Sequence, residues 1–112
     1  MSGVNKEILR KIIQRLEAVQ ARPAMYIGAD DNIESARAFF FGHALACVTF
    51  AENGSPTATH RKKVVEEHGW EYRSILIVAE MKEKGYSNRE IVREMIAVEI
   101  DTWRAFLHDQ KD

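Results

Sequence analysis

The sequence predicts an all-α fold, a compact bundle of about five helices. Three observations indicate this fold. Apolar residues recur at the spacing of a helical face through most of the chain. Residues typical of helix N-caps precede several of these runs, and short stretches containing Gly, Pro or Asn separate them. A chain of 112 residues has the length of one domain, so we expect residues 1–112 to form a single helical domain.

The first predicted helix spans Lys6–Ala21, with Asn5 as its N-cap. Its apolar stripe recurs at helical spacing and is widened by two neighbouring residues. The stripe consists of Ile8, Ile12, Leu16 and Val19, flanked by Leu9 and Ile13. Pro23 ends this helix, because a proline pushes the residue before it out of the α region. We expect a loop over Arg22–Asn32.

The second predicted helix starts after Asp31 and runs through Phe39–Phe41. Asp31 and Glu34 have the spacing of a capping box, and Asn32 is an alternative N-cap. Asn53–Gly54 supplies the stop signal. Apolar residues occupy nearly every face of this helix, so we expect it to be central or to contact a second copy of the chain. That pattern predicts a homo-oligomer.

The middle of the chain predicts two further helices. Ser55–Pro56 is typical of an N-cap followed by proline in the first turn, and it opens a polar helix that ends at Gly69. Its positive run Arg61–Lys63 is expected to face solvent. Trp70–Lys84 is predicted as the fourth helix, because good helix formers fill its second half. A strand over Ser74–Ala79 is the alternative, because that segment is rich in β-branched residues.

The last predicted helix has the clearest start signal, because Ser87 and Glu90 have the spacing of a capping box. One face then continues for about five helical turns. It consists of Ile91, Met95, Val98, Thr102 and Phe106.

Composition and charge exclude several classes of protein. The 16 Lys and Arg residues against 17 Asp and Glu give a net charge of −1, which disfavours a protein that coats nucleic acid. One Cys excludes a disulfide framework within the chain and is typical of a reducing compartment. We find neither a signal peptide nor a membrane span, and we expect a cytoplasmic protein without a membrane contact.

No combination of residues predicts a reaction, so we expect no enzyme, no metal and no cofactor. His43 and Cys47 lie four residues apart among apolar residues, which favours buried packing over nucleophilic catalysis. His60 and His68 are too far apart along a helix to share one ion. Neither Cys-x-x-Cys nor His-Glu-x-x-His occurs.

Residues 22–28 carry a specific resemblance. They read Arg-Pro-Ala-Met-Tyr-Ile-Gly, which resembles a segment of the ATPase domain of DNA gyrase B and related type II topoisomerases. That family also has a Glu and an Asn four residues apart on the next helix, and Phe41–Cys47 does not provide them. The sequence therefore does not support ATP hydrolysis. The chain more closely resembles small bacterial proteins of poorly defined function that carry Arg-Pro-x-Met-Tyr-Ile-Gly, and immunity-like roles among them imply partner binding.

The candidate binding residues belong to this segment and to the helix after it. They are Arg22, Pro23, Met25, Tyr26, Gly28 and Arg37. In one interpretation the segment is a structural clasp, in which Met25, Tyr26 and Ile27 pack against the bundle and Gly28 takes a positive φ. In the other it contacts a ligand or a partner. The two interpretations are compatible.

The first functional hypothesis is a small non-catalytic binding protein, immunity-like or partner-sequestering, that uses Arg22–Asp31 and nearby aromatic residues. An alternative is a nucleotide- or small-anion-binding protein in which Arg22, Tyr26 and Arg37 surround a helix N-terminus. The expected partner is therefore another protein or a small anionic ligand.

A second alternative is a helix-turn-helix DNA-binding regulator, because Lys84–Ile91 resembles the opening of that motif. The helix that follows would carry Glu94, Glu99 and Asp101 toward the phosphates of DNA. Nucleic acid is therefore the least favoured partner.

Overall fold

The computed structural model describes residues 5–50, 57–71 and 76–110, and within these ranges it is helical without strands. The prediction of an all-α bundle is confirmed. Helices α1 (Lys6–Ala21), α3 (Ile33–Phe50), α4 (Ala58–Glu67), α5 (Leu76–Glu83) and α6 (Asn88–His108) correspond to the five predicted ones. A short sixth, α2 (Pro23–Ile27), lies where a loop was expected. In the described ranges, no helix has the length and apolar character needed to cross a membrane.

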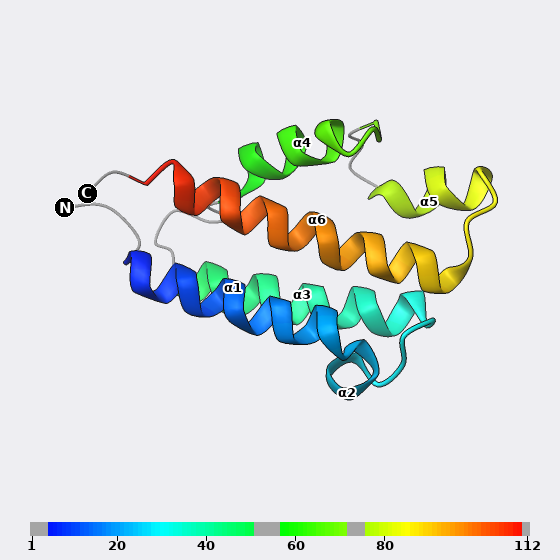
Figure 1. The fold of residues 1–112 in the computed structure, drawn as a ribbon, viewed down its shortest axis with the longest axis horizontal. Coiled ribbons are helices and arrows are strands. Elements are labelled where there is room, and N and C mark those ends of the chain that lie inside the picture. The colour runs from blue at the N-terminus through cyan, green and yellow to red at the C-terminus, as the bar shows by residue number, and fades with distance from the viewer. Residues whose placement is uncertain (1–4, 51–56, 72–75, 111–112) are drawn as a thin grey trace.

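Helix α6 lies at the centre of the bundle. Helices α1 and α3 pack on one side of it, and α4 and α5 pack on the other (Figure 1). Its most deeply buried side chains contact the core shared by the other helices, and they include Ile91, Val92, Ile96 and Ile100. The other helices therefore take their places from the surface of α6.

The N-terminal helix α1 has the predicted bounds and the predicted cap. Oδ1 of Asn5 accepts a hydrogen bond from the backbone N–H of Glu7 at 2.7 Å. The buried stripe is rotated slightly from the predicted one, because Leu9 and Ile13 lie fully inside. Ile8, which was predicted to belong to the centre of the stripe, is 42% exposed.

The expected loop Arg22–Asn32 contains helix α2, which corrects the prediction. Pro23 ends α1 but also begins α2, because its fixed φ and its missing N–H suit the first turn of a helix. Gly28 ends α2 in the left-handed conformation with φ +99°, as predicted, and its N–H donates to the carbonyl of Ala24 at 3.0 Å.

Helix α3 is capped by Asn32 and not by Asp31. Oδ1 of Asn32 accepts a hydrogen bond from the N–H of Ser35 at 2.9 Å, so the alternative cap is the correct one. The predicted stop at Asn53–Gly54 lies outside the described residues. Phe41 is 67% exposed, so α3 is not buried on all sides in one copy of the chain.

Helices α4 and α5 differ from the predicted ones at their starts. The N-cap position of α4 is Thr57, and the predicted cap at Ser55 lies outside the described residues. Trp70 is not helical, because Gly69 ends the preceding turn with φ +91° and the Trp70 N–H donates back to the carbonyl of Val65 at 3.1 Å. From Leu76 onward the segment is helical, which excludes the strand alternative for its described part.

The C-terminal helix α6 begins with the predicted capping box. The Ser87 side chain accepts from the N–H of Glu90, and the Glu90 side chain accepts from the N–H of Ser87. The predicted inward face is confirmed, with four of its five residues buried and Met95 half-buried.

The cap of α3 provides a stability test. Asn32→Ala is expected to lower the free energy of unfolding by about 1 kcal/mol, because the Ser35 N–H loses its acceptor. Asp31→Ala is the matched control and should change it by no more than about 0.5 kcal/mol. Urea unfolding followed by circular dichroism measures both. A larger loss for Asp31→Ala would contradict the assignment of the cap.

Candidate functional site

The sequence-predicted site lies mostly on α2 and the residues beside it. Met25 is 68% exposed and Tyr26 is 47% exposed, whereas Ile27 is buried. We call Arg22, Met25 and Tyr26 the α2 surface. The expectation that Met25 and Tyr26 pack against the bundle is wrong, because a helix of five residues turns only one side toward α1 and α3, and Ile27 occupies that side.

Pro23 and Gly28 fix the shape of this surface and do not present groups to a partner. Pro23 opens the helix and Gly28 closes it, so the intervening side chains are held on a rigid turn. Arg22 is exposed, at the junction of α1 and α2, and its N–H donates to the carbonyl of Ala18 at 3.1 Å.

Arg37 belongs to a different place, a cavity of about 590 Å³. Helices α3, α4 and α5 pack mainly on α6 and not on one another, and side chains from all four helices surround the cavity. Its lining includes none of the other five predicted site residues. The described residues that line it are Glu34, Arg37, Ala38, Phe40, Phe41, Arg61, Val65, Glu71, Ile77, Val78, Met95, Val98 and Glu99.

An ion pair borders this otherwise apolar cavity. Both terminal nitrogens of Arg61 donate to Glu99, one of them to Oε2 at 3.2 Å, and the same nitrogen donates to Oγ1 of Thr57 at 3.3 Å. The indole N–H of Trp103 donates to Oε2 of Glu99 at 2.9 Å. Each oxygen of the buried Glu99 carboxylate therefore has a hydrogen-bond donor, as a buried charge requires.

Sequence analysis missed the role of Arg61. It lies in a run of three positive residues and was expected to face solvent, but it reaches inward to Glu99, 38 residues later in the chain. Lys62 and Lys63 are exposed, as predicted. The signal that would have helped is the position of Arg61 beside the inward-facing Val64 and Val65.

His43 lies behind the ion pair. Its Nδ1 is 3.9 Å from Glu99, and its ring meets that of Trp103 edge to face, with centroids 6.0 Å apart. Burial lowers the pKa of His43; Glu99 opposes this shift and the positive charge of Arg61 reinforces it. The partly buried His43 agrees with the predicted packing role. The side chain of Cys47 lies outside the described part.

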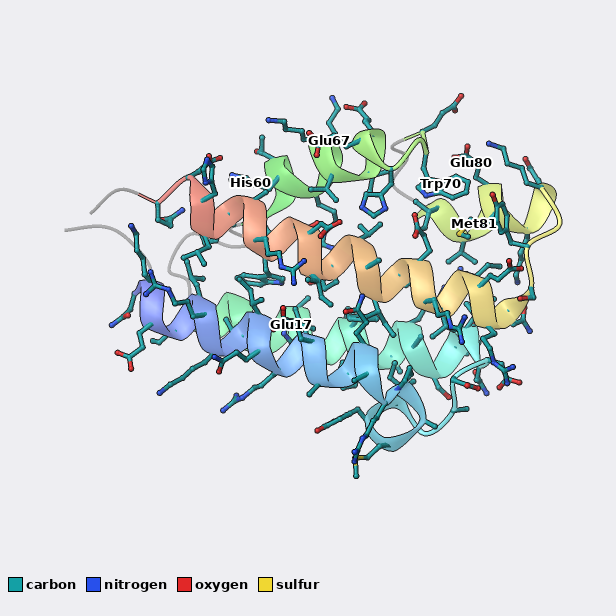
Figure 2. All side chains as sticks on the ribbon, in the orientation of Figure 1. Glu17, His60, Glu67, Trp70, Glu80 and Met81 are labelled. Carbon is teal, nitrogen blue, oxygen red and sulfur yellow. The ribbon has the colours of Figure 1, made fainter. Side chains whose placement is uncertain are left out.

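Two histidines attach α4 to α6. Nε2 of His60 lies 2.7 Å from Asp109 near the C-terminal end of α6 (Figure 2). His68 lies between two carboxylates, with Nδ1 2.9 Å from Glu94 and Nε2 2.8 Å from Asp101. In the parts that the structure describes, no group of His, Cys, Asp and Glu residues is arranged to hold a metal ion.

The environment of His68 favours its charged form. Burial alone would lower its pKa, but the hydrogen bonds and charges of Glu94 and Asp101 outweigh that effect and raise the pKa above the usual value. A protonated imidazole can donate from both nitrogens, which suits an acceptor on each side. The contact of α4 with α6 is therefore sensitive to pH.

Comparison of the chain with protein-family models, with curated proteins and with solved structures found no match.

The His68 contact provides a pH-dependent test. A raised folded-state pKa stabilises the fold fully below the unfolded value of 6.5, and this contribution is lost as the pH rises through the higher folded-state pKa. His68→Gln is therefore expected to lower the free energy of unfolding by about 1 kcal/mol at an acidic pH where Glu94 and Asp101 stay ionised, and by less at alkaline pH. Urea unfolding at both pH values measures the difference.

The control is His108→Gln, which changes an exposed histidine at the end of the same helix. It should leave the pH dependence almost unchanged. An equal loss for His68→Gln at both pH values would contradict the assigned charge of His68.

Proposed function

We propose that the protein is a non-catalytic binding protein and that the cavity between α3, α4, α5 and α6 holds a small, mostly apolar ligand. The observation that carries the proposal is the cavity itself. Its volume of about 590 Å³ lies in the range of small-molecule sites, roughly 300–1,000 Å³. Most of its lining is aliphatic or aromatic, with a few charged groups at defined positions, which is the usual composition of such sites.

The bonding of the charged groups supports binding over catalysis. Arg37 pairs with Glu34 at 3.2 Å, and Arg61 pairs with Glu99. A general base needs a free lone pair directed at the substrate, and the Glu99 oxygens already accept from Arg61 and Trp103. These groups stabilise the walls of the cavity.

A second candidate function is the contact of a partner protein with the α2 surface, in an immunity-like or partner-sequestering role. The exposure of Met25 and Tyr26 favours it, since aromatic and Met side chains are enriched at protein interfaces. The rigid turn between Pro23 and Gly28 would reduce the entropy lost on binding.

The remaining alternatives have less support. The anion-binding hypothesis joins Arg22, Tyr26 and Arg37, but Arg37 lines the cavity and is paired with Glu34. The regulator hypothesis needs a second turn soon after the start of the last helix, and α6 continues from Asn88 to His108 without one. The predicted homo-oligomer stays a prediction, which light scattering of the purified protein tests.

Blocking the cavity tests the first proposal. Ala38 is an exposed residue of α3 that lines the cavity, so Ala38→Trp places an indole in it without removing a core side chain. The neutral dye N-phenyl-1-naphthylamine should bind the wild-type protein with increased fluorescence, and Ala38→Trp should weaken that binding about tenfold. Ala44→Trp is the matched control, since Ala44 is exposed on the same helix and does not line the cavity. Equal binding by both variants would contradict the proposed site.

Truncation tests whether the α2 surface is free for a partner. Met25→Ala and Tyr26→Ala are each expected to change the free energy of unfolding by less than about 0.5 kcal/mol, because both side chains are exposed. Ile27→Ala should cost about 2 kcal/mol, because Ile27 is the buried anchor of α2. Thermal and urea unfolding measure the three variants. A large loss for Tyr26→Ala would favour the structural clasp.

A further inference from the structure

One polar group beside the cavity lacks a hydrogen-bond acceptor. Nε of Arg37 is shielded from solvent and has no partner among the described residues. The terminal nitrogen of the same guanidinium donates to Glu34 at 3.2 Å, so Arg37 is anchored at one end and unsatisfied at the other. Buried donors are nearly always paired with an acceptor. The Nε–H of Arg37 is thus a specific requirement that a ligand can meet.

The charges around the cavity limit what that ligand is. The positive charges of Arg37 and Arg61 are balanced by Glu34 and Glu99, and Glu71 adds a further negative charge to the lining. An anionic ligand would lose its hydration without meeting an unbalanced cation. A cationic ammonium has only donors, so it leaves the N–H of Arg37 unpaired.

We infer that the ligand is a neutral amphiphile, with an apolar body in the cavity and one carbonyl-type acceptor that binds Nε–H of Arg37. This inference rests on the proposed function of the cavity. The body would contact side chains such as Phe40, Met95 and Val98. At about 30 Å³ for each water-sized group, the cavity has room for roughly 15–20 non-hydrogen atoms.

The position of Arg37 orients the ligand. The Glu34 side chain with which it pairs is 78% exposed, whereas Val78 and Val98 in the lining are buried. The carbonyl end therefore lies at the solvent side of the cavity, and the apolar end lies toward α6. An acceptor placed there meets the guanidinium without carrying polar atoms into the apolar interior.

Three probes with the same chain length and different head groups test the inference: 2-octanone, octanoate and octylamine. Each is titrated against the full chain, with displacement of N-phenyl-1-naphthylamine and backbone amide shifts as the two measurements. The ketone is expected to bind at least about fivefold more tightly than either charged probe. Arg37→Met removes the donor and keeps an apolar stem, and it should weaken ketone binding by about the same factor while leaving dye binding within about twofold.

Arg10→Met is the control for the loss of one positive charge, because Arg10 is exposed on α1 and outside the cavity lining. It should leave the order of the three probes unchanged. If octanoate or octylamine binds as tightly as the ketone, or if Arg37→Met leaves ketone binding unchanged, the inferred ligand class is wrong and the cavity remains a ligand site. If neither the dye nor any probe binds, the proposed function itself is wrong.

Discussion

The structure depends on the burial of one long helix, α6. This helix of 21 residues has inward side chains on several sides, among them Ile91, Val92, Ile96, Ile100 and Trp103. Helices α1, α3, α4 and α5 each cover part of it. Because α3, α4 and α5 pack mainly on α6 and not on one another, their packing leaves space over the middle of α6. The cavity is thus a consequence of how the helices are arranged.

The polar contacts between α4 and α6 maintain this arrangement. Helix α4 carries mostly charged residues and offers few apolar side chains to the core, chiefly Val64 and Val65. His60, Arg61 and His68 each bind a carboxylate of α6, and these contacts extend over the length of α4. A partly buried ion pair contributes little net stability once desolvation is counted, but it disfavours other registers, which would leave a charge unpaired. The polar contacts therefore specify where α4 lies, and α4 forms one wall of the cavity.

Local signals predicted the fold well, and long-range contacts limited what could be predicted of the site. The caps at Asn5 and Ser87 depend on groups within three residues, so the sequence contained what was needed to place α1 and the start of α6. Arg61 meets its partner only after the chain has folded, and nothing in its neighbours shows whether a Glu waits 38 residues away. The single turn of α2 is also too short for apolar periodicity to reveal it.

Separation of Arg37 from the Arg-Pro-x-Met-Tyr-Ile-Gly segment changes how that segment is interpreted. Pro23, Ile27 and Gly28 have local roles that account for their residue types: a preset first turn, a buried anchor and a left-handed end. Neither the turn nor the anchor requires Met25 or Tyr26 to be large and apolar, because both project into solvent. Their exposure costs hydration free energy without a gain in packing. The segment is therefore a clasp at its ends and at Ile27, and a contact surface at Met25 and Tyr26.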